Sequence, residues 1–208
     1  FREYEIKKEE TVRSFLTKEE IRLLMEGRLK NAKQELYRDL YLFCAFTGLS
    51  FADMRNLTEK NVVRDHEGNL WIETRRQKTG TPENVRLLDI AIEIMKKYRG
   101  VAPDGKLFPM LTKESMNIHL KKMAAQCGID RNLSFHTARH TYATEICLSN
   151  GVPIETISKM MGHSSIRTTQ IYAEITNQKV RRDFGKLSEE TKGMYSLPDD
   201  NMPSRVYQ

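Results

Sequence analysis

The period of the hydrophobic pattern changes in one part of this chain, and the change limits the folds open to it. Residues 70–76 and 83–88 are short runs with alternating polarity or with β-branched and aromatic side chains, which is typical of β-strands. The segment KTGTPE between them carries the turn residues Gly80 and Pro82. A further short run at 62–64, followed by the turn DHEGN, precedes them. We therefore predict a small three-stranded antiparallel β-sheet.

Helical patterns lie on both sides of that segment. Thr17 and Glu20 have the spacing of a capping box, as do Ser50 and Asp53, so each pair predicts a helix start. Gly48 is a typical helix end. Apolar residues at helical spacing predict helices near 17–26, 31–47, 89–98, 112–127, 136–149, 153–161, 165–173 and 176–188. The expected fold class is mainly α with one small antiparallel sheet inserted between helices (α+β).

The composition is that of a basic chain without membrane or secretion signals. Its 208 residues include 34 Lys and Arg against 28 Asp and Glu, a formal charge of +6. A positive balance favours polyanionic partners, because their binding releases counterions. The three cysteines are widely spaced in apolar contexts, which favours reduced core residues over disulfides or metal ligands. No apolar run reaches the ~18 residues of a membrane helix and no signal peptide is visible, so we expect a cytoplasmic protein.

One predicted helix start is rich in cationic and titratable side chains. His136, Arg139 and His140 lie within the segment HTARH, and His136 shares a helix face with Arg139 because they are three positions apart. A solvated helix start is the ordinary explanation of such a cluster. A zinc site on His136 and His140 has suitable spacing, but the glutamate of H-E-x-x-H and a third ligand are not evident. We therefore expect no metal site.

A second motif, MGHSSIRTTQIYAEI, follows downstream. Gly162 and His163 end an apolar helix, and Tyr172 comes nine positions after the histidine. A tyrosine is usually a buried or half-buried aromatic, but this short polar segment buries little, so we expect an exposed, functional hydroxyl. Lys78 lies at the tip of the predicted hairpin, where a solvated turn lysine is the ordinary alternative.

Taken in order, these motifs resemble the tyrosine recombinase (phage integrase) family, of the mobile-element integrase type. The resemblance rests on TGL with an acidic residue at Asp53, the hairpin Lys78, H-x-x-R-H, GH and the later tyrosine. It covers roughly residues 17–188. It implies the catalytic-domain fold of that family and a site-specific recombinase that cuts and rejoins DNA through a 3′-phosphotyrosine. It also implies that neither a cofactor nor a metal is needed, because fixed cations stabilise the charge of the transition state.

The resemblance implies a role for each motif residue. Tyr172 attacks the scissile phosphodiester, and Arg139 binds its nonbridging oxygens. His136 is a general acid or base, Lys78 protonates the leaving 5′-oxygen, and His163 donates a hydrogen bond to the phosphate. The supporting residues are Ser50, Asp53 and His140. Asp53 is expected to orient the cationic network.

The chain departs from the family pattern directly after TGL. The family carries its first catalytic arginine there, whereas this chain has Ser50, which supplies no positive charge. Arg76 is our candidate for the replacement, because it lies two residues from Lys78 and alternate strand residues point to one side. Arg55 and Arg75 are weaker candidates.

The resemblance also implies how the chain is divided and what it binds. We expect a leading arm or linker at 1–16, a catalytic domain at 17–190 and a disordered tail at 191–208, in a fragment that lacks an N-terminal core-DNA-binding domain. Double-stranded DNA is the expected partner, with a tetramer on DNA and possible monomers of the isolated fragment. Residues 176–188 either dock on a neighbouring subunit or pack in cis. The alternatives left open are a catalytically impaired DNA-binding regulator and a type IB topoisomerase-like activity.

Overall fold

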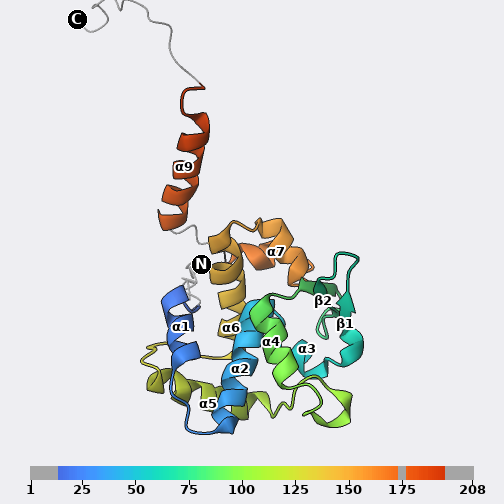
Figure 1. Cartoon of the computed structure of the whole chain (residues 1–208). Helices are drawn as coiled ribbons and strands as arrows, with labels where there is room; N and C mark the ends of the chain where they lie inside the picture. The colour runs from blue at the N-terminus through green and yellow to red at the C-terminus, as the bar shows by residue number, and fades with distance from the viewer. Residues whose placement is uncertain (1–13, 173–176, 195–208) are drawn as a thin grey trace, which may run out of the picture. The chain divides into compact units, whose positions relative to one another are not determined.

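The computed structural model describes residues 14–172 and 177–194, and the chain divides into two units, residues 1–173 and 174–208. The first unit carries the sheet and the helices α1 to α8, and the second carries the helix α9 (Figure 1). Among the described residues, no helix has the length and apolar character that crossing a membrane requires.

The predicted sheet is present. Its strands β1 (Val62–Arg64), β2 (Leu70–Arg75) and β3 (Pro82–Arg86) pair in antiparallel fashion in that order. Ile72 pairs with Val85, and both side chains are fully buried, so one face of the sheet packs on the core. Strand β2 ends at Arg75, one residue earlier than predicted, because the chain then turns.

The turn between β2 and β3 is closed by its own backbone. Arg76 N–H donates to the Thr81 carbonyl at 2.9 Å, and Gly80 N–H donates to the Arg76 carbonyl at 2.8 Å. Gly80 has a φ of +68°, a conformation that glycine adopts without steric cost. The β2–β3 loop, residues 76–81, is therefore a defined structure from which side chains can be aimed.

Most of the predicted helices are found within a few residues of their expected bounds. Both predicted caps form: Thr17 makes a complete capping box with Glu20, and Ser50 Oγ accepts from Asp53 N–H at 3.2 Å. The α-helices are α1 (Lys18–Glu26), α2 (Ala32–Thr47), α3 (Phe51–Asn56), α4 (Asp89–Lys97), α5 (Lys113–Gln126), α6 (Phe135–Thr141), α7 (Ile154–Met160), α8 (Arg167–Gln170) and α9 (Asn177–Thr191).

Two helix predictions are wrong in detail. The single helix predicted over 136–149 is α6 followed by a π-helical segment, Tyr142–Cys147, and a 3₁₀ turn, Leu148–Asn150. The π-helical segment begins where Tyr142 packs against Gly48, so closely that a Cβ at Gly48 would lie 2.3 Å from the tyrosine ring. Of the helix predicted over 165–173, the described part, residues 165–172, contains only the single turn α8.

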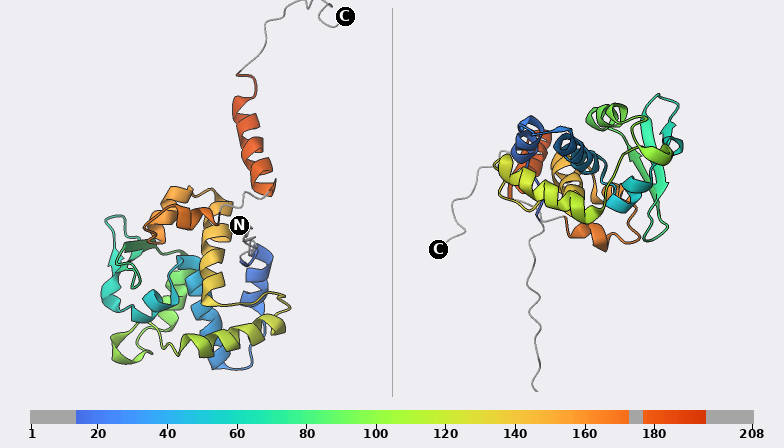
Figure 2. Two further views of the ribbon diagram at one scale, coloured as in Figure 1. Left: turned by 180° about the vertical axis from the view of Figure 1, so that it is seen from behind. Right: turned by 90° about the horizontal axis from the view of Figure 1, so that it is seen from below.

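The core is built around α2. This helix packs against α4, α5 and α6 (Figure 2), and most of its side chains are buried. Cys44 and Cys147 are buried and Cys127 is partly buried, all as free thiols, in agreement with the core role predicted for them. Gly48 ends α2 in the left-handed conformation, with a φ of 73°, and its carbonyl is thereby turned toward α6.

The predicted arm and tail fall largely outside the described residues. Of the predicted arm 1–16, Leu16 is fully buried, and its N–H donates to Thr141 Oγ1 at 2.9 Å. In the second unit, Phe184 and Leu187 on α9 are exposed.

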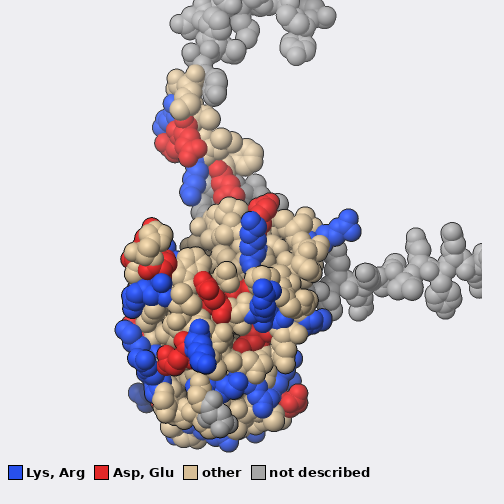
Figure 3. All heavy atoms as spheres, turned by 90° about the vertical axis from the view of Figure 1, so that its right-hand side faces the viewer, with Lys and Arg blue, Asp and Glu red and all other residues tan. Residues whose placement is uncertain are grey.

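The side of the first unit that carries β1 and β2 shows Lys and Arg side chains spread among Asp and Glu side chains (Figure 3).

Candidate active site

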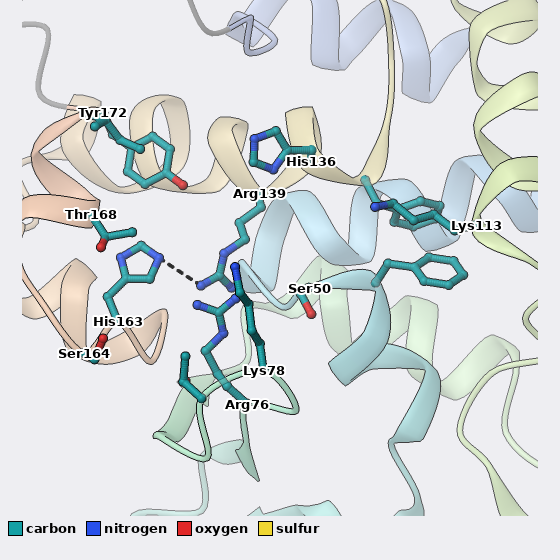
Figure 4. A pocket seen from close by; sticks show the side chains of 14 residues that line it. Ser50, Arg76, Lys78, Lys113, His136, Arg139, His163, Ser164, Thr168 and Tyr172 are labelled. Atoms are coloured by element: carbon teal, nitrogen blue, oxygen red, sulfur yellow. Dashed lines mark hydrogen bonds between the residues drawn. The ribbon is translucent and has the colours of Figure 1, made fainter.

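A pocket of about 410 Å³ lies between the start of α3, the β2–β3 loop, the start of α6 and the α7–α8 segment (Figure 4). All the side chains predicted to be catalytic line it, together with one supporting residue. They are Ser50, Arg76, Lys78, His136, Arg139, His163 and Tyr172. The remaining predicted residues, Asp53 and His140, are buried and bonded to members of this set. Segments more than a hundred residues apart in sequence thus form one site.

Arg139 is almost fully buried, with 5% of the residue exposed. Its Nη1 donates to the Gly48 carbonyl and to Glu83 Oε1, the latter at 2.8 Å. Its Nη2 donates to the Met161 carbonyl and contacts His163 Nε2 at 3.1 Å. All four Nη hydrogens therefore have an acceptor, so the guanidinium is held in one orientation. An anion reaches Arg139 at Nε or by replacing one of these acceptors.

The tautomer of His163 follows from its neighbours. Because an arginine has no acceptor, His163 Nε2 must be the unprotonated nitrogen in its contact with Arg139. The other nitrogen, Nδ1, lies 2.7 Å from Thr169 Oγ1 and carries the proton. Burial and then the charges of Arg139 and Arg76 lower the pKa of His163 to about 4. The imidazole is therefore neutral at pH 7.

His163→Asn is expected to reduce the acid sensitivity of the fold. An unfolded histidine gains its proton near pH ~6.5, whereas His163 in the fold gains it only near its pKa of about 4. The unfolded state thus binds more protons in this window, and the free energy of unfolding falls as the pH falls through it. Asparagine does not titrate. The stability deficit of His163→Asn relative to wild type should therefore be smaller at about pH 5 than at about pH 7.5. Urea unfolding at both pH values measures this.

The exposed His66 provides the control for that measurement, since 91% of its side chain is exposed. His66→Asn should change the free energy of unfolding only slightly, because that side chain is almost fully exposed. All other titrating groups are shared by variant and wild type, so their contributions cancel. A stability deficit of His163→Asn that is equal at both pH values would show that His163 titrates normally in the fold.

Arg76 lies in the pocket beside the buried Asp53. Its side chain is 16% exposed, and its Nε is 3.8 Å from Asp53 Oδ2. Asp53 also accepts from Ser50 Oγ at 2.6 Å and from Gln77 N–H at 2.8 Å, so it joins α3 to the β2–β3 loop. Burial and then Arg139 lower the pKa of Arg76 from its usual value. The serine that replaces the expected arginine thus takes part in the network that holds Arg76.

The two weaker candidates lie elsewhere. Arg55 is exposed on α3 and lines a different pocket, and Arg75 Nη1 donates to the Gly80 carbonyl at 3.1 Å on an exposed part of the loop. Arg76 and Lys78 follow the strand rather than belong to it, yet the β2–β3 loop directs both side chains into the pocket (Figure 4). Lys78 is exposed to solvent there.

Gly162 lies directly against Arg76. It has a φ of +58°, and a Cβ built on it would lie 2.9 Å from Arg76 Cγ and Cδ and 3.1 Å from the Pro82 carbonyl. Gly162→Ala is therefore expected to displace the Arg76 side chain and to cost about 1–2 kcal/mol in backbone strain. The DNA cleavage that the resemblance implies should fall by about tenfold or more, since a displacement of about 1 Å in an active site can cost 10²-fold.

Gly128→Ala separates these two effects. Gly128 also has a positive φ, +71°, but a Cβ there meets nothing within 4 Å. That variant should lose a similar amount of stability by thermal unfolding and keep its cleavage rate. Equal cleavage rates for the two variants would show that the contact of Gly162 with Arg76 has no part in the reaction.

The ring of Tyr172 is packed between two histidines. Its centroid lies 4.8 Å from that of His140, edge to face, and 6.2 Å from that of His163, nearly parallel. The tyrosine is 6% exposed, contrary to the expectation that this segment buries little. The segment is better buried than its polarity suggests, because Thr169 is fully buried against His163. The hydroxyl nevertheless points into the pocket, on the side of Arg139 and His136 (Figure 4).

His136 and His140 form a direct pair across one helical turn. Their Nε2 atoms are 2.9 Å apart, so one nitrogen donates and the other accepts, and the two rings cannot both be protonated at Nε2. His140 is 2% exposed and contacts both His136 and Tyr172. His140 therefore connects Tyr172, the candidate nucleophile, to His136, the candidate general acid or base. Among the described residues, no group of three or more His, Cys, Asp or Glu could hold a metal ion.

Two charged residues of the site were not singled out from the sequence. Glu83 contacts Arg139 from β3, and Lys113, the first residue of α5, lines the pocket. Glu83 had a detectable signal: with Val85 and Leu87 it forms the inward side of an alternating strand, where a charged residue is exceptional. Lys113 gave no such signal, since a lysine at a helix start is ordinary.

Comparison with known proteins identifies the family of the chain. Residues 14–179 match the model of the phage integrase family. A tyrosine recombinase of Pseudothermotoga lettingae is 28% identical over 85% of this chain and 61% of its own length. The tyrosine recombinase XerA of Saccharolobus solfataricus is 33% identical over 67% of this chain and 46% of its own length. The chain belongs to the phage integrase family of tyrosine recombinases, and it spans about half to three fifths of the length of these relatives.

Solved structures share the fold. The site-specific recombinase XerH, bound to palindromic difH substrate in a post-cleavage complex, superposes with a TM-score of 0.68 at 21% identity, over 85% of this chain and 54% of its own. The Tn1549 transposon integrase in complex with transposon right end DNA superposes with a TM-score of 0.60 at 19% identity, over 84% of this chain and 66% of its own. The mainly helical catalytic-domain fold predicted from the motifs is confirmed.

Proposed function

We propose that this chain is the catalytic part of a site-specific DNA recombinase that cuts and rejoins DNA through a 3′-phosphotyrosine. One observation carries the proposal: the Tyr172 hydroxyl points into a pocket lined by Arg139, Arg76 and Lys78. A phosphodiester is an anion that repels nucleophiles, and permanent cations around a nucleophile suit it to such a substrate. Membership of the family and the DNA-bound relatives of similar fold support the same reaction.

In the cleavage step, Tyr172 Oη attacks phosphorus and the 5′-oxygen leaves. Negative charge gathers on the nonbridging oxygens, where Arg139 and Arg76 stabilise it. The phenolic proton passes to His136, which is paired with His140, and Lys78 supplies a proton to the leaving oxygen. Two guanidinium groups and an ammonium group supply the charge that a divalent metal supplies in other phosphoryl-transfer enzymes, so we propose a reaction without metal or cofactor.

His163 must change its proton to contribute as proposed. Its Nε2 accepts from Arg139 in the structure, whereas a hydrogen bond to phosphate needs a proton on that nitrogen. When a phosphate oxygen replaces His163 Nε2 as the acceptor of Arg139 Nη2, Nε2 loses its donor and takes up a proton from water. Binding of the substrate thus converts His163 from an acceptor for Arg139 into a donor for phosphate.

The rejoining step reverses the first. A 5′-hydroxyl from a second DNA strand attacks the phosphotyrosine and releases Tyr172, and the covalent link conserves the energy of the broken bond.

We propose double-stranded DNA as substrate and a tetramer on DNA as the working assembly, with residues 176–188 docking on a neighbouring subunit. The exposed Phe184 and Leu187 on α9 provide an apolar surface for that contact. Integration or excision of a mobile element, in the bacterial nucleoid, is the proposed setting.

A nicked suicide duplex tests the chemistry, because its short leaving strand diffuses away and traps the covalent complex. We expect a protein–DNA band that survives denaturation and depends on Tyr172. DNA binding without that band would identify a regulator instead. Relaxation of supercoiled plasmid without exchange between two sites would identify a topoisomerase-like activity. Sequencing the junctions that the full-length protein forms on genomic DNA distinguishes element integration from inversion and from chromosome-dimer resolution.

A further inference from the structure

A carboxylate lies against the arginine of this pocket, although the pocket is otherwise suited to bind an anion. Glu83 is fully buried, and its Oε1 accepts from Arg139 Nη1 at 2.8 Å. Its Oε2 has no hydrogen-bond partner among the described residues. A buried, half-satisfied carboxylate costs stability, and none of the roles proposed above uses Glu83. Its presence therefore needs an explanation.

We propose that Glu83 is a positioning residue for the cleavage step, which holds the Arg139 guanidinium with its Nε and Nη2 edge toward the scissile phosphate. This proposal rests on the proposed recombinase function. Glu83 and the Gly48 carbonyl together take both hydrogens of Nη1. The opposite nitrogen, Nη2, contacts His163, which lines the pocket. With Nη1 fixed, a phosphate that replaces His163 meets the guanidinium side-on, in the two-point geometry that arginine offers to oxyanions.

The charge of Glu83 matters as well as its hydrogen bond. Burial and then repulsion from Arg139 lower the pKa of Arg76, and Glu83 and Asp53 counteract that shift. An amide in place of Glu83 could still accept from Nη1, but it would leave the two guanidinium groups with one counterion fewer. A carboxylate therefore allows two buried cations to share one phosphate site before the substrate brings its own negative charge.

The ionisation of Glu83 gives the proposal a pH signature. Burial raises the pKa of Glu83 to about 7, and Arg139 opposes that shift. The charged groups that act on it are Arg139 from α6, Arg76 from the β2–β3 loop and Asp53 from α3. The buried Cys44 of α2 and Tyr142 of the π-helical segment also face it, and burial keeps both neutral. Cleavage by bound enzyme should therefore rise with pH through about 7, as the carboxylate forms.

The test compares Glu83→Gln with Glu73→Gln in the full-length protein. Glutamine keeps the size of the side chain and an acceptor for Nη1, but removes the charge. Glu73 is an exposed carboxylate on β2 of the same sheet, so its replacement is the matched control. Single-turnover cleavage of the nicked duplex is measured across pH, and affinity for the duplex is measured separately by fluorescence anisotropy. Wild type and Glu83→Gln, each with and without Arg139→Lys, complete a double-mutant cycle.

We expect Glu83→Gln to cleave about 10–100-fold more slowly, to bind DNA at least as tightly as wild type, and to lack the acid limb near pH 7. In the Arg139→Lys background its effect on the rate should largely disappear, since Glu83 acts through Arg139. Glu73→Gln should match wild type throughout.

Three outcomes would overturn the positioning role. They are a Glu83→Gln rate equal to wild type, a loss of affinity equal to the loss of rate, and a cost that is undiminished in the Arg139→Lys background. A further outcome, a wild-type cleavage rate that stays flat across pH, overturns the pH signature even if Glu83→Gln does not fold. If wild type forms no covalent complex, the recombinase function fails and this proposal fails with it. A wild-type complex with an unchanged Glu83 variant rejects the positioning role alone.

Discussion

Tyr172→Phe is expected to abolish the covalent protein–DNA complex, a loss of about 10⁴-fold or more, while leaving the fold and DNA binding intact. The substitution removes only the hydroxyl that points into the pocket and keeps the ring between His140 and His163. Without an oxygen nucleophile no phosphotyrosine can form. Denaturing electrophoresis of the reaction on the nicked duplex measures the loss, and anisotropy with the same duplex measures retained binding.

Tyr142→Phe is the matched control. Tyr142 is also buried, at 2% exposed, and its hydroxyl contacts Met160 Sδ at 4.0 Å instead of entering the pocket. That variant should form the complex normally. Mass spectrometry of the linked peptide gives an independent check, because the tryptic peptide 168–179 has Tyr172 as its only tyrosine. A DNA adduct on another peptide, or one that persists in Tyr172→Phe, would refute the assignment of the nucleophile.

The same variant tests whether a subunit cleaves with its own tyrosine. In the structure Tyr172 lines the pocket that contains Arg139 of the same chain. A mixture of Tyr172→Phe and Arg139→Ala subunits should therefore remain inactive, since neither has a complete site. Activity restored by mixing would show that the tyrosine is donated to a neighbouring subunit.

The local signals in the sequence predicted the elements well because those signals act over a few residues. The caps at Thr17 and Ser50, the glycine at position 48 and the strand alternation each specify a boundary through short-range contacts. The π-helical segment after Thr141 was not predictable in this way. It begins where Tyr142 contacts Gly48, which lies 94 positions earlier in the sequence. The hydrophobic periodicity of a segment does not indicate a contact with a residue so distant in sequence.

The motifs identified the site residues but did not explain the glycines within them. The carbonyls of Gly48 and Met161, from TGL and MGH, both accept hydrogen bonds from Arg139. Gly48 gives room to Tyr142, and Gly162 gives room to Arg76. The three motifs are therefore parts of one arrangement around a buried guanidinium. Its fourth partner, Glu83, belongs to none of the motifs, which is why sequence reasoning missed it.

Arg76→Ala is expected to lower the rate of covalent complex formation by about 10²–10³-fold, the usual cost of removing one donor that stabilises an oxyanion. Arg55→Ala and Arg75→Ala should stay within a few fold of wild type. The reason is placement: Arg76 lines the pocket beside Asp53, whereas Arg55 lines another pocket and Arg75 caps the loop from outside. Single-turnover cleavage of the nicked duplex measures all three. Loss of activity in Arg55→Ala with activity retained in Arg76→Ala would refute the replacement.

A rescue variant asks whether position 50 and position 76 supply the same charge. Ser50 and Arg76 both line the pocket and both contact Asp53, at 2.6 Å from Ser50 Oγ and 3.8 Å from Arg76 Nε. Adding Ser50→Arg to Arg76→Ala should therefore restore part of the lost rate, because the new guanidinium can reach the same carboxylate and the same phosphate. Ser50→Arg with Arg76 retained should gain nothing, since two guanidinium groups would compete for Asp53. A rescue that fails while the double variant stays folded and binds DNA would mean that the cation must approach the phosphate from the β2–β3 loop.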